Sequence, residues 1–118
     1  MDASKKQALT AAGINVEEVL GRFMGNEALL ERMLKKFLSD PTYSKLQDAA
    51  DTADAEEGLR AAHTLKGLCG NLSLTALVPL FTRQVELFRA GDPAAAFAML
   101  AQIDPVYQQI SAAIRALN

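Results

Sequence analysis

The sequence predicts an all-α protein, an antiparallel four-helix bundle with an additional short N-terminal helix. Apolar residues recur with helical spacing along nearly the whole chain, and no stretch shows the strict alternation of a half-buried strand. Capping residues divide these stretches and leave only short links between them. With 118 residues, half of them hydrophobic, the chain can hold one core, and we expect residues 1–118 to form one domain.

The N-terminal part of this pattern is weaker than the rest. Residues 1–13 form a lead-in for which the spacing supports at most a loose helix, ended by Gly13. Asn15 followed by Glu18 is typical of a capping box. These residues predict a short amphipathic helix that stops near Gly25.

The next predicted helix begins after Asn26, a favourable capping residue. Asp40-Pro41 either kinks this helix or restarts it through residues 46–50, because proline cannot continue the backbone hydrogen-bond ladder. Both readings leave a long helical segment before residue 51, which serves as one helix of the bundle.

The C-terminal half contains two further predicted helices. The first begins between Ser73 and Ala76 and ends at Gly91. Its apolar stripe comprises Leu74, Val78, Phe81, Val85 and Phe88. Asp92-Pro93 opens the second in the preferred order of cap and proline. This last helix runs to the terminus with one predicted interruption, a kink at Asp104-Pro105.

The only histidine of the chain, His63, lies in the middle of a helix that Asp54 and Glu57 open as a capping pair. At about 100° per residue, the apolar residues of this helix share one stripe. They are Ala61, Leu65, Leu68, Cys69 and Leu72. His63 lies almost opposite the centre of that stripe, so we expect its imidazole to face solvent.

The neighbours of His63 indicate what the imidazole does. Gly67 and Gly70 lie one and two turns along on the same face, and each weakens the helix by up to about 1 kcal/mol relative to alanine. We interpret them as clearance around the ring. Lys66 and Arg60 are surface neighbours three residues away on either side. A neutral imidazole with clearance and positive charge beside it suits reversible attack on a phosphoryl group.

These residues resemble a known motif. Ala62-His63-Thr64-Leu65-Lys66-Gly67, with Gly70, Asn71 and Leu72 in step, is similar to the motif of the histidine-containing phosphotransfer (HPt) domains of bacterial multistep phosphorelays. The resemblance extends without a gap to Gly91-Asp92 and loosely back to Gly13-Ile14 and Phe23, so it covers most of the chain. It implies that His63 accepts a phosphoryl group from an aspartyl phosphate on a receiver domain and passes it to another receiver.

Two positions depart from that family pattern. The family has a glycine after asparagine-leucine, where this chain has Ser73, a departure that is easily tolerated if Ser73 caps the following helix. The leucine-glutamate pair often found further on is Gln84-Val85 here, with Glu86 one place late. The second departure argues against a side-chain brace from that helix to the imidazole.

Composition excludes several function classes. A formal net charge of −2 argues against nucleic acid, which requires a basic face. No apolar run approaches the roughly 18 residues of a membrane span, and the first residues lack the apolar region of a signal peptide, so we expect a cytoplasmic protein. The single cysteine, Cys69, is expected as a buried free thiol. The acidic residues of one segment are interpreted as capping and solubilising groups and not as a metal site: Asp48, Asp51, Asp54, Glu56 and Glu57.

Three functions fit this sequence to different degrees. A phosphocarrier uses all the features around His63. A catalytic or metal-binding bundle is disfavoured by the single histidine and the lack of a Glu-x-x-His pair. The third is a helical interaction module whose histidine is unused. The sequence has no phosphate-binding loop, so we expect no kinase activity, no cofactor of its own, and a receiver that supplies Mg²⁺.

Some assignments stay open on sequence alone. Leu59, beside His63, is either the edge of the core or a partner contact, and Arg60 is either a docking group or a solvated side chain. We expect a monomer that binds receiver domains and neither nucleic acid nor membrane. The sequence does not name the receivers, the direction of phosphoryl flow, or whether these residues are one domain of a larger hybrid kinase.

Overall fold

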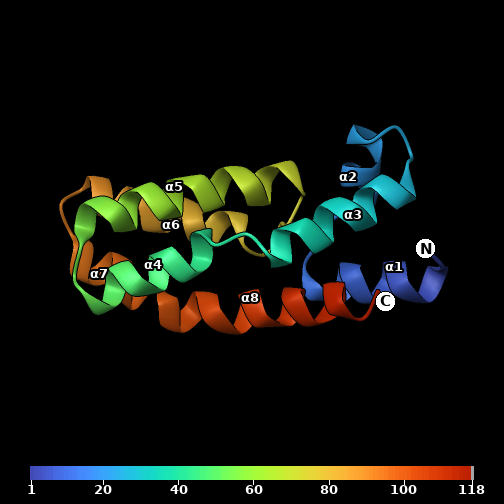
Figure 1. Cartoon of the computed structure of the whole chain (residues 1–118). Helices are drawn as coiled ribbons and strands as arrows, with labels where there is room; N and C mark the ends of the chain where they lie inside the picture. The colour runs from blue at the N-terminus through green and yellow to red at the C-terminus, as the bar shows by residue number, and fades with distance from the viewer. Residues whose placement is uncertain (118) are drawn as a thin grey trace.

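Residues 1–117 are described by a computed structural model in which this part of the chain is helical and contains no strand. Four segments alternate in direction to form the bundle (Figure 1). They are α3 (Glu27–Leu38) with α4 (Thr42–Asp51), α5 (Ala55–Asn71), α6 (Val78–Arg89), and α7 (Pro93–Ala98) with α8 (Leu100–Arg115). The predicted all-α antiparallel bundle is confirmed.

Two N-terminal helices, α1 (Ala3–Ala12) and α2 (Val16–Arg22), cover one end of this bundle (Figure 1). α1 is more than a loose lead-in, because the Asp2 carboxylate accepts a hydrogen bond from the Lys5 amide (2.8 Å) and Leu9 is fully buried where α1 packs against α8. Gly13 ends α1 at a φ of 111°, and its carbonyl oxygen accepts a hydrogen bond from the Ala76 amide at 3.1 Å. α1 is thereby attached to the turn after α5.

The predicted caps are present. The side chains of Asn15, Asn26, Asp54 and Asp92 accept hydrogen bonds from the first turns of α2, α3, α5 and α7. Asp40-Pro41 restarts the helix instead of kinking it, since α3 ends at Leu38 and the Asp40 carboxylate accepts a hydrogen bond from the Thr42 amide at 2.8 Å.

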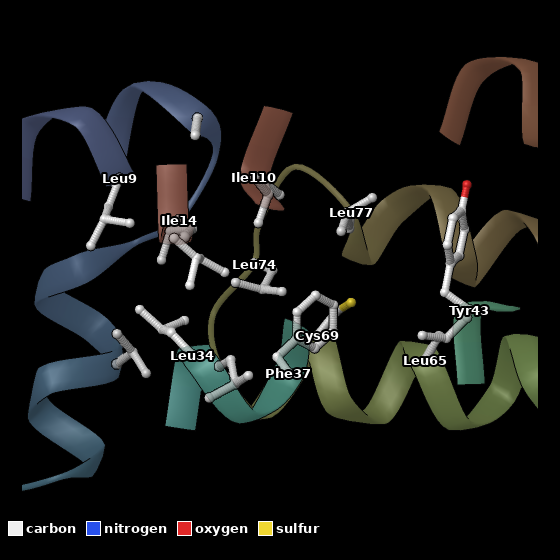
Figure 2. Close-up of a cluster of buried hydrophobic side chains, with 14 of the residues drawn as sticks. Leu9, Ile14, Leu34, Phe37, Tyr43, Leu65, Cys69, Leu74, Leu77 and Ile110 are labelled. Carbon is white, nitrogen blue, oxygen red and sulfur yellow. The ribbon is translucent and has the colours of Figure 1, made fainter. Parts of the chain in front are cut away.

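One large core joins all the segments, and side chains from α1, α3, α5, α8 and the α5–α6 turn converge in it (Figure 2). The residues labelled there are Leu9, Ile14, Leu34, Phe37, Tyr43, Leu65, Cys69, Leu74, Leu77 and Ile110. Tyr43 stacks on Tyr107 with ring centroids 3.7 Å apart, and its hydroxyl donates a hydrogen bond to Asp104 (2.8 Å). These contacts join α4 to α8.

A smaller core lies between the N-terminal half of α5, the C-terminal half of α6 and α7. It consists of Ala62, Val85, Phe88 and Ala96, with Leu59, Leu87 and Phe97 packed against it. Gly58 allows this close packing, because a β-carbon there would lie 2.7 Å from ring atoms of both Phe88 and Phe97. The sequence pattern did not single out Gly58.

The predicted start of α6 between residues 73 and 76 is wrong, since α6 begins at Val78. The reason is the way α5 ends. Ser73 adopts a left-handed conformation (φ 54°), its amide donates to the Gly70 carbonyl (3.2 Å), and the Leu74 amide donates to the Cys69 carbonyl (2.9 Å). This Schellman arrangement makes Ser73 the residue that terminates α5 and not a cap of α6. Leu74 is buried in the turn before α6.

The last helical segment is interrupted at Met99 and continues through the predicted kink site, Asp104-Pro105. The Ala96 carbonyl accepts hydrogen bonds from the Met99 amide (3.2 Å) and from the Gln84 side chain (2.9 Å). A tertiary contact from α6 thus takes part in ending α7. The sequence pattern around Pro105 could not reveal this contact.

Candidate functional site

His63 lies midway along α5, and its side chain is exposed as predicted. The opposite side of the helix determines this orientation. Leu65 and Cys69 are buried in the large core, and Ala62 is buried in the small core against Val85. Because α5 is packed through both sets of residues, rotation that would bury His63 would expose them.

The imidazole borders a shallow hollow of about 300 Å³ on the surface of the small core. It is lined by Glu56, Leu59, Arg60, His63, Thr64 and Arg89. Among residues 1–117 no group is hydrogen-bonded to the ring, and the Thr64 hydroxyl donates instead to the Arg60 carbonyl (3.0 Å). The ring is therefore held by the backbone of α5 and not by a bonded partner.

Both glycines beside His63 face open space. A β-carbon at Gly67 or Gly70 would have no atom within 4 Å, apart from its own helix backbone and chain neighbours. Close packing, which explains Gly58, therefore does not explain these two residues. An incoming group can approach the imidazole from the side of Gly67, which is itself exposed.

The cations near His63 differ in how they are engaged. Lys66 is half-buried and has no ion-pair partner within the described part of the chain. Arg60 pairs with Glu57 and lies 3.6 Å from Glu56, so its charge is largely neutralised on α5 itself. Of the two basic residues near the ring on α5, Lys66 is therefore the one whose charge is not paired with a carboxylate among the described residues.

Arg89 is a further residue of the hollow that the sequence pattern did not indicate. It is exposed in the last turn of α6, and it lines the same hollow as His63. No sequence spacing relates it to His63, because the two residues come together only through the packing of α6 on α5.

The helix that follows in sequence provides no brace to the imidazole. Gln84 is fully buried and its amide nitrogen donates to the Ala96 carbonyl, while Val85 is buried in the small core and Glu86 is exposed. This arrangement agrees with the expectation from the sequence. Leu59 is half-buried at the edge of the small core and also lines the hollow.

The C-terminus of α5 is held by Arg22 from α2. Its guanidinium donates to the carbonyl oxygens of Gly70 (2.6 Å) and Asn71 (3.1 Å) and to the Ser73 hydroxyl (2.8 Å). The Glu18 carboxylate accepts hydrogen bonds from both Arg22 (2.7 Å) and Ser73 (2.9 Å). Since α5 has no basic residue in its last turn, Arg22 supplies the cation that the helix dipole favours there.

Outside the His63 hollow, grooves, metal-ligand clusters and membrane-spanning helices are the features of the described chain that would indicate another function. A larger groove of about 440 Å³ lies beside the C-terminal end of α5, over Phe23, Met33 and Leu68, and does not include His63. Within residues 1–117 no group of three His, Cys, Asp or Glu side chains could hold a metal ion. None of the helices described is long and apolar enough to cross a membrane.

Fold and site together define a helical bundle that presents one unbraced, accessible histidine beside a free lysine. A family model, the Hpt domain, matches residues 18–116, and the chain belongs to this family. Searches of curated proteins and of solved structures found no match. Hpt domains are phosphocarriers of phosphorelays that interact with receiver domains and have no catalytic activity of their own.

Proposed function

We propose that His63 is the phosphoryl carrier of this domain, accepting the group from an aspartyl phosphate on a receiver domain and passing it to another. The single observation that supports this most strongly is the exposed, unbonded imidazole with open space above Gly67. The lone pair of the neutral ring nitrogen attacks phosphorus, the bond from phosphorus to the aspartyl oxygen breaks, and that oxygen leaves as carboxylate. The other ring nitrogen keeps its proton, so the phosphorylated ring carries one positive charge beside the negative phosphoryl oxygens.

Lys66 is proposed to neutralise charge on the transferred group without entering the chemistry. Lys66 lies one turn after His63 on α5, and its ammonium has no ion-pair partner among the residues described. An exposed pair of this kind is worth about 0.2–1 kcal/mol, and more once a docked receiver excludes water.

The receiver is expected to supply the magnesium ion. Glu56, the carboxylate in the hollow, lies 3.6 Å from Arg60 and makes a poor cation ligand. The domain is expected to act as a monomer, since the proposal takes both His63 and Lys66 from one chain.

A transfer assay with a panel of radiolabelled, phosphorylated receivers tests the proposal. Label on the wild-type domain should be acid-labile and alkali-stable, as for a phosphoramidate bond, and absent from His63→Gln. Lys66→Ala should slow transfer about ten- to a hundredfold, and rising salt should narrow this gap. Label that survives in His63→Gln, or that is alkali-labile, would contradict the proposal. An unused histidine in an interaction module would take no label from any receiver.

A further inference from the structure

Arg89 is the residue of the hollow that neither the fold nor the carrier role of His63 explains. It is exposed, it lines the hollow with His63, and it lies on a different helix. We propose that the Arg89 guanidinium binds the phosphoryl group carried by His63 and stabilises the phosphorylated state of the domain. This inference rests on the proposed function, since it assigns the group that holds the phosphohistidine between two transfers.

The packing of α6 on α5 places Arg89 on the opposite side of the imidazole from Lys66. The two helices are antiparallel (Figure 1). The close approach at Gly58 puts Phe88 beside the turn of α5 that precedes His63. Arg89, the next residue, therefore lies toward the N-terminal side of His63, whereas Lys66 lies toward the C-terminal side. A phosphoryl group on the ring would have a cation on each side.

The charges in the hollow leave Arg89 available for this role. Arg60 forms ion pairs with Glu57 and Glu56. Glu56, the carboxylate that lines the hollow, is therefore paired with Arg60 and not with Arg89. Arg89 has no carboxylate within ion-pair distance among residues 1–117, in contrast to Arg83 on the same helix, which lies 3.5 Å from Glu86. A guanidinium presents a planar fork of donors that matches two phosphoryl oxygens. A phosphoryl group on His63 would therefore supply the negatively charged partner that Arg89 does not have among the described residues.

The lifetime of the phosphohistidine tests this contact without any receiver. Potassium phosphoramidate can phosphorylate an exposed imidazole directly: the phosphorus–nitrogen bond of the reagent breaks, ammonia leaves, and the ring nitrogen bonds to phosphorus. After the reagent is removed, decay of phospho-His63 is followed by phosphorus NMR in wild type, Arg89→Ala, Arg89→Lys and Arg83→Ala. Arg83→Ala is the matched control, because it removes the same charge from the same helix outside the hollow.

Arg89→Ala should shorten the lifetime about two- to fivefold at low salt, the effect of one exposed ion pair. Arg89→Lys should recover part of it, high salt should reduce the difference, and Arg83→Ala should match wild type. Equal lifetimes for wild type and Arg89→Ala, equal shortening by Arg83→Ala, or a wild type that takes no label would overturn the inference. If the contact is found but no receiver transfers label to His63, the proposed relay function fails and the contact stands.

Discussion

Gly67 determines how closely another molecule can approach His63. The imidazole is not bonded to any group among the described residues, so access is controlled by what stands beside it on α5. A side chain at position 67 would extend into open space one turn from the ring. Helix stability and the proposed phosphotransfer therefore favour different side chains at position 67.

We predict that Gly67→Leu keeps the fold and gains up to about 1 kcal/mol of helix stability, because leucine is a better helix former than glycine. Phosphotransfer from a receiver should slow about tenfold or more, since the leucine side chain keeps the donor phosphorus from its productive position. Thermal unfolding and single-turnover transfer rates measure the two effects. Gly67→Ala is the control and should raise stability with a smaller loss of rate. Unchanged transfer in folded Gly67→Leu would show that the clearance is accidental.

α5 is held in place as an element by contacts at both ends that come from other elements. Near its N-terminus Gly58 admits the rings of Phe88 and Phe97, and at its C-terminus Arg22 bonds the carbonyl oxygens of Gly70 and Asn71. Because His63 lies between these two points, its position depends on α2, α6 and α7 as well as on α5.

We predict that Arg22→Ala lowers the free energy of unfolding by about 1–2 kcal/mol, since it removes charged hydrogen bonds to the end of α5 and to Ser73. Hydrogen exchange should accelerate first at the amides of the last turn of α5. Arg83→Ala serves as the control for losing an exposed arginine, and it should change neither quantity by a comparable amount. If both variants unfold alike, Arg22 is an ordinary surface residue.

The packing of the whole bundle shields the Cys69 thiol from solvent. Cys69 lies at the centre of the large core with no exposed surface, and burial raises the pKa of its thiol to about 12 (Figure 2). In the unfolded chain this thiol ionises near its ordinary value, about 8.5. Between these two pKa values the unfolded state loses a proton that the native state keeps, so the thiol contributes a loss of stability as pH rises through this range.

We predict that a thiol-specific reagent at pH 8 labels Cys69 only through unfolding of the bundle. The labelling rate should rise with denaturant in parallel with the loss of helical circular dichroism, and Cys69→Ala should take no label. Rapid labelling in native buffer would mean that α5 separates from the helices packed against it, α4 and α6, without global unfolding.

How much of the structure can be predicted from the sequence differs between local and tertiary features. The helical spacing of apolar residues and the caps at Asn15, Asn26, Asp54 and Asp92 are local, and they predicted the bundle and most helix starts. The start of α6 was misplaced because Ser73 adopts a left-handed conformation at the end of α5, where its hydroxyl also donates to Glu18 of α2. The break at Met99 coincides with a hydrogen bond from Gln84 of α6 to the Ala96 carbonyl. Such contacts leave no periodic signal.

The same division holds at the candidate site. By itself the sequence determined that His63 faces away from the apolar stripe of α5, that Lys66 lies beside it, and that both adjoining glycines are on its face, because all of this follows from the pitch of one helix. Only the tertiary structure decided that Arg89 lines the hollow and that Arg22 caps α5, since residues on different helices meet through packing and not through spacing along the chain.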